Sequence, residues 1–230
     1  MLYTDKCKGC GLCREYCEKA FTDECARCGK CSAVCYNGAR VLCGEEKSVD
    51  GIFAVVRSDF DYYEMSGGGV TLSGGEPLLQ AEFASELLKK CKENGIHTAI
   101  ETAGNVPFSV FESVVPYTDL FLYDIKCIDE KLHRELTGAS NHLILENAER
   151  LKKMPTEIIF RMPFVPGFND SEVKAVSAFS DNKKLEIMPY HNICSSKYEA
   201  LGRVFETENA EVPDENEIKR LAEIFPNVIN

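Results

Sequence analysis

Eight of the twelve cysteines lie within the first 35 residues, at a spacing that is typical of metal ligands. A run of the form C-x2-C-x2-C-x3-C begins at Cys7, and the same run begins again at Cys25. Thiolates two residues apart on a tight loop can bind three irons of one [4Fe–4S] cubane, while the fourth thiolate crosses to a neighbouring cluster. We therefore predict two [4Fe–4S] clusters. The first cysteine site consists of Cys7, Cys10, Cys13 and Cys35, and the second cysteine site consists of Cys17, Cys25, Cys28 and Cys31.

Zinc and disulfides explain these cysteines less well. Structural zinc would use separated C-x2-C pairs, and the crowded runs leave almost no loops for disulfides to close. The spacing resembles that of bacterial two-cluster ferredoxins, and Gly9, Gly11 and Gly29 suit a backbone that turns closely around sulfur. A proline often follows the fourth cysteine of such a run, whereas Glu18 and Tyr36 stand there in this chain. That difference removes no ligand.

The charge balance excludes several classes of partner. The chain has 37 acidic and 26 basic side chains, for a formal net charge of −11. Such a field repels nucleic acids and anionic membranes. The first residues show no basic and apolar leader, and no apolar run approaches the roughly 18 residues of a membrane span. We expect a cytoplasmic protein with no nucleic-acid and no membrane partner.

The elements that follow the cysteine runs predict an α/β fold. We expect a small domain over residues 1–45, a helix over 48–63 that leads out of it, and a larger domain over 46–230. Strands are expected at 70–73, 97–101, 119–126, 156–162 and 184–190, with helices at 78–94, 108–115, 129–137 and 144–153. Strands that alternate with helices predict a parallel sheet, open or closed into a barrel.

Polar or glycine-rich segments come where each of these strands ends, at the edge where parallel α/β folds bind ligands. They are Gly74, Gly75, Glu76 and Pro77, then Glu101 and Thr102, then Asp124, Ile125 and Lys126, then Arg161 and His191. Simpler explanations exist for each one: a flexible glycine connection, an Asp124–Lys126 salt bridge and an ordinary histidine. A phosphate-binding P-loop is not supported, because no G-K-[ST] follows the glycines. Cys43, Cys91, Cys127 and Cys194 are scattered singly and are expected to be inert.

The ordered set of segments resembles the activating enzymes of glycyl radical enzymes, which belong to the radical S-adenosylmethionine (SAM) superfamily. The resemblance runs from Cys7 to the C-terminus through YYEMSGGGVTLSGGEPLLQAEF, GIHTAIETAG, DLFLYDIK, HRELTGASNHLILEN, RMPFVPGFND and MPYHNICSSKYEALG. It implies a partial radical SAM (β/α) barrel joined to a ferredoxin-like domain. It also implies SAM as cofactor, a glycyl radical enzyme as protein substrate, and flavodoxin or ferredoxin as electron donor.

The resemblance assigns roles to the candidate residues. Residues 74–77 would present backbone groups to the methionyl amino group of SAM, and residues 124–126 would contact its methionyl or ribose end. His191 would close the pocket near the carboxylate, and Arg161 would lie near the cluster end. Glu101, Thr102 and Asp124 match positions that form a cation site beside SAM in relatives.

The C-x3-C-x2-C motif that holds the family's catalytic cluster is absent from this sequence. The resemblance therefore predicts that a first barrel strand and three catalytic cysteines are missing upstream, and that a third [4Fe–4S] cluster binds only if they are restored. A complete activating enzyme that has lost its first residues is the favoured interpretation. The alternatives are a non-catalytic two-cluster electron carrier or partner-binding protein, and a plain binding protein in which the clusters only staple the fold.

Overall fold

The computed structural model describes residues 1–230 except 20, 21, 23, 27, 226 and 230. The chain divides into two compact units, and each unit combines two segments. The larger unit comprises Lys47–Tyr190 and Ala210–Asn230, and the smaller unit comprises Met1–Glu46 and His191–Asn209. Within the described residues, no helix is both long and apolar enough to cross a membrane.

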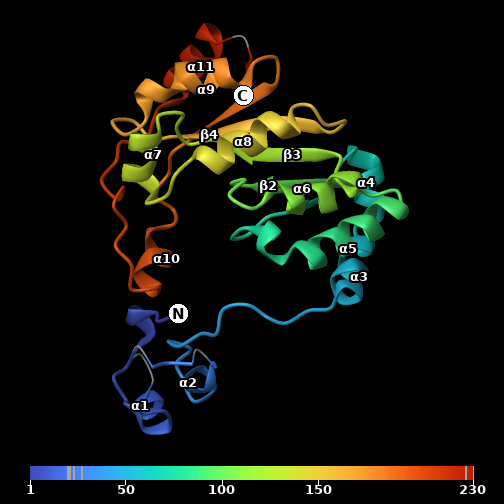
Figure 1. The fold of residues 1–230 in the computed structure, drawn as a ribbon. Helices are drawn as coiled ribbons and strands as arrows, with labels where there is room; N and C mark the ends of the chain where they lie inside the picture. Colours follow the sequence, from blue (N-terminus) through green and yellow to red (C-terminus); the bar gives the residue numbers. More distant parts are fainter. Residues whose placement is uncertain (20–21, 23, 27, 226, 230) are drawn as a thin grey trace. The chain divides into compact units, whose positions relative to one another are not determined.

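The larger unit is built on a six-stranded sheet in which every neighbouring pair is parallel. The strands lie side by side in chain order (Figure 1). They are β1 (Gly69–Leu72), β2 (His97–Thr102), β3 (Leu120–Asp124), β4 (Glu157–Phe164), β5 (Lys184–Pro189) and β6 (Val228–Ile229). The prediction of a parallel α/β sheet is confirmed, in the form of a partial barrel.

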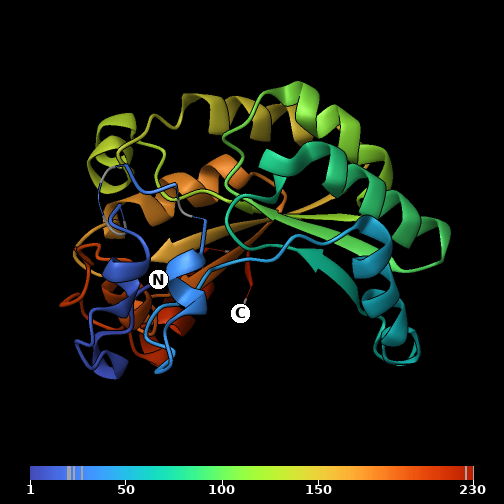
Figure 2. The same cartoon turned by 90° about the horizontal axis from the view of Figure 1, so that it is seen from below.

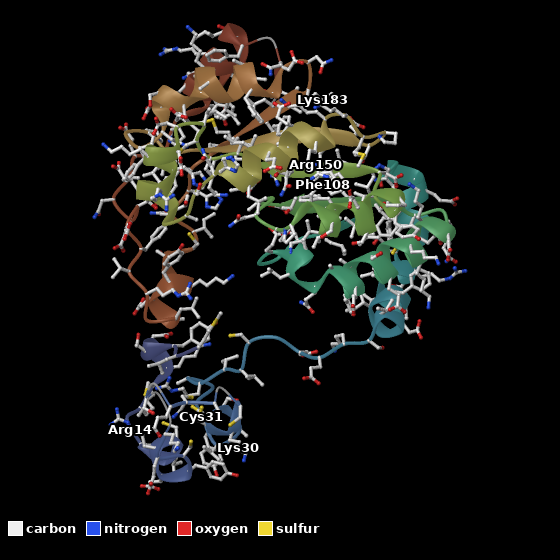
Figure 3. The ribbon with its side chains drawn as sticks, viewed as in Figure 1. Arg14, Lys30, Cys31, Phe108, Arg150 and Lys183 are labelled. Carbon is white, nitrogen blue, oxygen red and sulfur yellow. The ribbon has the colours of Figure 1, made fainter. Side chains whose placement is uncertain are left out.

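Helices that connect the strands cover one face of this sheet (Figures 1 and 2). They are α5 (Ala81–Glu93), α6 (Phe108–Val114), α7 (Glu130–Thr137), α8 (His142–Leu151), α9 (Val173–Ser180) and α11 (Glu215–Ile224). Short 3₁₀ turns complete the connections: η2 (Pro77–Gln80), η3 (Val115–Tyr117) and η4 (Asp170–Glu172). Two of the helices are linked by a cation–π contact, because the Arg150 guanidinium of α8 lies 3.5 Å from the centre of the Phe108 ring of α6 (Figure 3).

The core forms where the sheet meets these helices. Successive side chains of a strand point to opposite faces, so each strand sends alternate residues into the core. Tyr123 and Phe160 are fully buried on neighbouring strands and contact edge to face, with ring centres 5.9 Å apart. The residues that alternate with the buried ones along β3 and β4 point to the opposite face, and most of them are only half-buried. Polar side chains can therefore lie on that face and remain accessible to a ligand.

Two further helices precede the sheet, α3 (Val49–Ser58) and α4 (Phe60–Ser66). The Ser48 side chain caps α3 by accepting a hydrogen bond from the Gly51 N–H. The single helix expected over 48–63 is wrong, because Asp59 leaves the helical conformation at φ −99° and ψ 10°. Phe53 and Val56 of α3 pack against α5 in a second, smaller hydrophobic cluster.

The smaller unit has little regular structure. It contains η1 (Thr4–Lys6), α1 (Leu12–Tyr16), α2 (Lys30–Ala33) and α10 (Ser195–Ala200). Both helices of the cysteine region begin after a glycine in the left-handed conformation, Gly11 at φ 79° and Gly29 at φ 76°. The later segment of the unit is tied to the first residues, since the Leu2 N–H donates to the Ala200 carbonyl at 2.8 Å. No pattern in the sequence indicated that residues 191–209 fold with the cysteine region.

Candidate functional site

The candidate residues of the larger unit lie after β1, at the ends of β2 and β3, and within β4, where Arg161 comes three residues before the strand ends and not at its end as expected. Gly74 and Gly75 lie in the turn after β1, where both are exposed. Gly74 adopts φ 125°, which disfavours any other residue, and a side chain at either position would meet nothing within 4 Å. The backbone of this turn is therefore open to a ligand. Pro77 follows as the first residue of η2.

The Glu76 carboxylate is engaged within the protein. It accepts hydrogen bonds from the Leu78 N–H at 3.1 Å, the Thr102 hydroxyl at 2.8 Å and the Ala103 N–H at 2.9 Å. The buried Thr102 hydroxyl in turn accepts from the Gly104 N–H at 3.0 Å. Glu76 thus ties the turn after β1 to the end of β2. The Thr102 side chain points to the helix-covered face, so its backbone is the part that can face a cation.

A row of charged side chains crosses the half-buried face of the sheet. Arg161 of β4 pairs with Glu101 of β2 at 3.1 Å and with Glu186 of β5 at 2.8 Å. Ser73, just after β1, donates its hydroxyl to the other Glu101 oxygen at 2.9 Å. The register places Asp124 of β3 directly beside Arg161. The structure therefore brings Glu101, Asp124 and Arg161 together, and it adds Glu186, which the sequence did not single out.

Asp124 has unsatisfied hydrogen-bonding capacity. Its Oδ2 atom lies 3.5 Å from the Lys126 ammonium, while its Oδ1 atom is buried and has no partner among the described residues. Burial raises the pKa of this carboxyl, Glu101 raises it further, and Lys126 and Arg161 oppose the rise. A buried acceptor without a partner is costly unless a ligand satisfies it. The neighbouring Ile125 sends its side chain into the core and donates its N–H to the Arg161 carbonyl at 2.8 Å.

Three buried side chains from other parts of the fold hold the loop after β3. Asn169 donates its amide to the Lys126 carbonyl, and Asn141 donates to the carbonyls of residues 127 and 128. The Glu172 carboxylate accepts from the N–H groups of residues 128 and 129. The loop that carries Lys126 is therefore fixed before any ligand binds. Asn141 and Asn169 are common turn residues, but nothing in the sequence says which carbonyl groups they reach.

In the smaller unit, the four residues of the first cysteine site line one cavity of about 290 Å³. Hydrogen bonding from the backbone N–H of Arg40 is the main cause that lowers the pKa of Cys35, with further N–H groups at Ala39 and Asn37. Such N–H groups favour the thiolate, which is the form that binds metal. His191 belongs to this unit as the first residue of its second segment, and it is exposed.

At the second cysteine site three of the four thiols are half-buried, compared with two of the four at the first site. Cys17, Cys25 and Cys31 are half-buried and Cys28 is exposed, while positions 20, 21, 23 and 27 between them lie outside the described residues. Among the residues that the structure does describe, no three side chains of the metal-binding types converge on a single point. At the first site, the four thiols that line one cavity are the donor set that a [4Fe–4S] cluster uses.

Comparison with known proteins agrees with the parallel sheet. The profile of the Radical SAM superfamily matches residues 28–179. The chain belongs to this superfamily. Membership implies SAM and a [4Fe–4S] cluster as the family's cofactors.

Two curated relatives of this radical SAM protein are activating enzymes. It is 39% identical over 197 residues to the trans-4-hydroxy-L-proline dehydratase activating enzyme of Clostridioides difficile, covering 82% of this chain and 65% of the relative. It is 39% identical over 194 residues to the choline trimethylamine-lyase activating enzyme of Oleidesulfovibrio alaskensis, covering 80% of this chain and 63% of the relative. The chain thus spans less than two thirds of the length of these relatives.

Two solved structures share the fold of the radical SAM chain. A domain of the pyruvate-formate lyase-activating enzyme from Bacteroides vulgatus matches with a TM-score of 0.57 and 26% identity, over 71% of this chain and 99% of that one. SuiB from Streptococcus suis, bound to its precursor peptide SuiA, matches with a TM-score of 0.60 and 18% identity, over 79% of this chain and 39% of that one. The second likeness concerns the fold alone.

Proposed function

We propose that this chain is an activating enzyme for a glycyl radical enzyme, or the SAM-binding portion of one, which acts in the cytoplasm with two [4Fe–4S] clusters in its cysteine region. The relatives named above are activating enzymes, and the fold is that of a radical SAM protein. The observation that carries the SAM site is the buried Asp124 oxygen without a partner, set beside Arg161 and Lys126 at the edge where parallel strands end.

The residues of this edge have separate tasks in the proposed site. The exposed backbone at Gly74 and Gly75 would accept from the amino group of SAM, and Asp124 would accept from a donor of the ligand through its free oxygen. Lys126 would balance the negative charge of the methionyl carboxylate, while Arg161 is held between Glu101 and Glu186 and would fix the charged row beside it. When bound, SAM would supply the family's chemistry, in which one electron from a [4Fe–4S] cluster cleaves it to methionine and a 5′-deoxyadenosyl radical that removes a hydrogen atom from a glycine of the protein substrate.

The proposal is tested by measuring SAM binding calorimetrically to the anaerobically reconstituted chain. Asp124→Asn is expected to weaken binding roughly tenfold or more, because a hydrogen bond to a charged group contributes about 1.5–3 kcal/mol and 1.4 kcal/mol corresponds to a factor of ten. Asp61→Asn is the matched control, since Asp61 is exposed on α4. Equal SAM affinity in the wild type and both variants would exclude Asp124 from the site.

An electron carrier is the second candidate, favoured by the cysteine-lined cavity. It differs from an activating enzyme in what it does with SAM under reducing conditions. Release of 5′-deoxyadenosine in dithionite supports the activating enzyme. Roughly eight irons per chain, by the arithmetic of two four-iron clusters, together with no SAM cleavage supports the carrier. In either case flavodoxin or ferredoxin is the proposed electron donor.

A further inference from the structure

The cavity of the first cysteine site is lined by cations as well as by thiols. Lys8, Arg14 and Arg40 border it, and no carboxylate is among the described residues that do so. Figure 3 marks Arg14 on α1, and it marks Cys31 and Lys30 on α2. Lys8 and Arg14 are exposed and form no ion pair with any residue that the structure describes. Their positive charge therefore acts on the cavity without a carboxylate beside it.

The surroundings of the second cysteine site are more acidic. Glu18 directly follows Cys17, and Glu24 directly precedes Cys25. The nearby cation Lys19 is already paired with Glu24 at 2.9 Å. In the sequence, Arg27 next to Cys28 and Lys30 next to Cys31 offset Glu18 and Glu24, so the residues adjacent to these cysteines carry no net charge. In a chain with a net charge of −11, the three cations of the first site are a strong local exception.

Hydrogen bonds add to this difference in charge. The backbone of Asn37, Ala39 and Arg40 borders the same cavity as Cys35, so its N–H groups can donate to sulfur there. Hydrogen bonds to cluster sulfurs and the local charge are two of the factors that set the reduction potential of an iron–sulfur cluster. Both raise the reduction potential, because each stabilises the reduced cluster, which carries one more negative charge.

We propose that the cluster bound by Cys7, Cys10, Cys13 and Cys35 has the higher reduction potential of the two and receives the first electron that enters the cysteine region. This inference rests on the proposed binding of two clusters. A [4Fe–4S]²⁺ cluster with four thiolates has a net charge of −2, and the added electron reduces it to [4Fe–4S]⁺ with a net charge of −3. Lys8 and Arg14 lower the energy of that state at the first site. The first electron is therefore held on the cluster of the first cysteine site.

The test is a reductive titration of the reconstituted chain, followed by electron paramagnetic resonance. The wild type is expected to show two one-electron steps. In the double variant Lys8→Gln/Arg14→Gln the higher step moves to a lower potential while the lower step stays in place. Lys197→Gln is the matched control, because it removes one positive charge from α10, which does not line the cavity. Lys30→Gln is expected to move the lower step instead.

Charge-retaining substitutions separate electrostatics from folding. Lys8→Arg/Arg14→Lys is expected to restore the higher step, whereas a general loss of structure would not be repaired by charge alone. A double variant that moves the lower step, moves both equally, or moves neither would overturn the inference. Iron and sulfide analysis keeps this failure distinct from failure of the proposed function. A chain that binds one cluster or none refutes the two-cluster proposal, while eight irons with unchanged steps refute only the assignment of potentials.

Discussion

Replacing Glu76 with alanine is expected to destabilise the larger unit by about 2–4 kcal/mol. The carboxylate accepts three hydrogen bonds, and its truncation leaves the buried Thr102 hydroxyl and the Ala103 N–H without an acceptor. A hydrogen bond to a charged group contributes roughly 1.5–3 kcal/mol. The Leu78 N–H contributes less to the loss, because water can reach the exposed turn after β1. We therefore expect the larger unit to lose the free energy of one to two such hydrogen bonds, because water partly replaces the carboxylate at the exposed turn.

The assay is urea unfolding followed by circular dichroism, with the midpoint compared at an unchanged slope. For a unit of this size, a change of about 1 kcal/mol moves the melting temperature by roughly 2–4 °C, so the variant should melt about 4–15 °C below the wild type. Glu76→Gln keeps one acceptor oxygen, so its melting temperature should lie between those of the wild type and Glu76→Ala. Glu82→Ala is the control, because Glu82 is exposed in the first turn of α5 and should change stability by less than about 0.5 kcal/mol.

One outcome would refute this reasoning. If Glu76→Ala unfolds within about 0.5 kcal/mol of the wild type, the hydrogen bonds do not hold the turn. If SAM binding is lost at the same time, the carboxylate contacts the ligand directly instead of fixing the backbone that does.

Three further changes follow from the same contacts. Glu172→Gln should lower the unfolding free energy by about 1–3 kcal/mol, measured in urea, because both N–H groups donate to one carboxylate oxygen and an uncharged amide oxygen accepts them more weakly; an unchanged midpoint would contradict this. Burial would raise the pKa of Asp119, but hydrogen bonds from Lys92 and Thr98 lower it below its ordinary value of 3.8. The ionised Asp119 therefore stabilises the fold above about pH 4, and this stabilisation is lost as the pH falls through the lowered pKa. Asp119→Asn should make the melting temperature fall less steeply below about pH 4 than it does in the wild type. The same steepness in both proteins would contradict this prediction. Gly104→Ala should fail to accumulate as folded protein, because its Cβ would lie 1.8 Å from the Tyr123 hydroxyl at φ 73°, and normal thermal unfolding of this variant would show that the loop can move.

Much of the fold could be predicted from the sequence. The alternation of apolar segments with helical patterns predicted five of the strands to within a few residues, because period-two and period-3.6 patterns reflect burial directly. The two-residue strand β6 is too short to show any period. Helix α11 did leave a signal, since Ile218, Leu221 and Phe225 recur at helical spacing and pack against the core.

The candidate site, like the fold, could be predicted only in part. Sequence by itself determined the residue types at the strand ends and the spacing of the cysteines, because both are local properties of the chain. Only the tertiary structure decided which of them meet. Pairing of β4 with β5 brings Glu186 to Arg161, and the fold leaves one oxygen of Asp124 without a partner. In the smaller unit, folding gathers Cys35 with Lys8 and Arg14 around one cavity, although up to 27 positions separate them in the chain. Contacts between distant positions depend on how whole elements pack, and no local pattern encodes them.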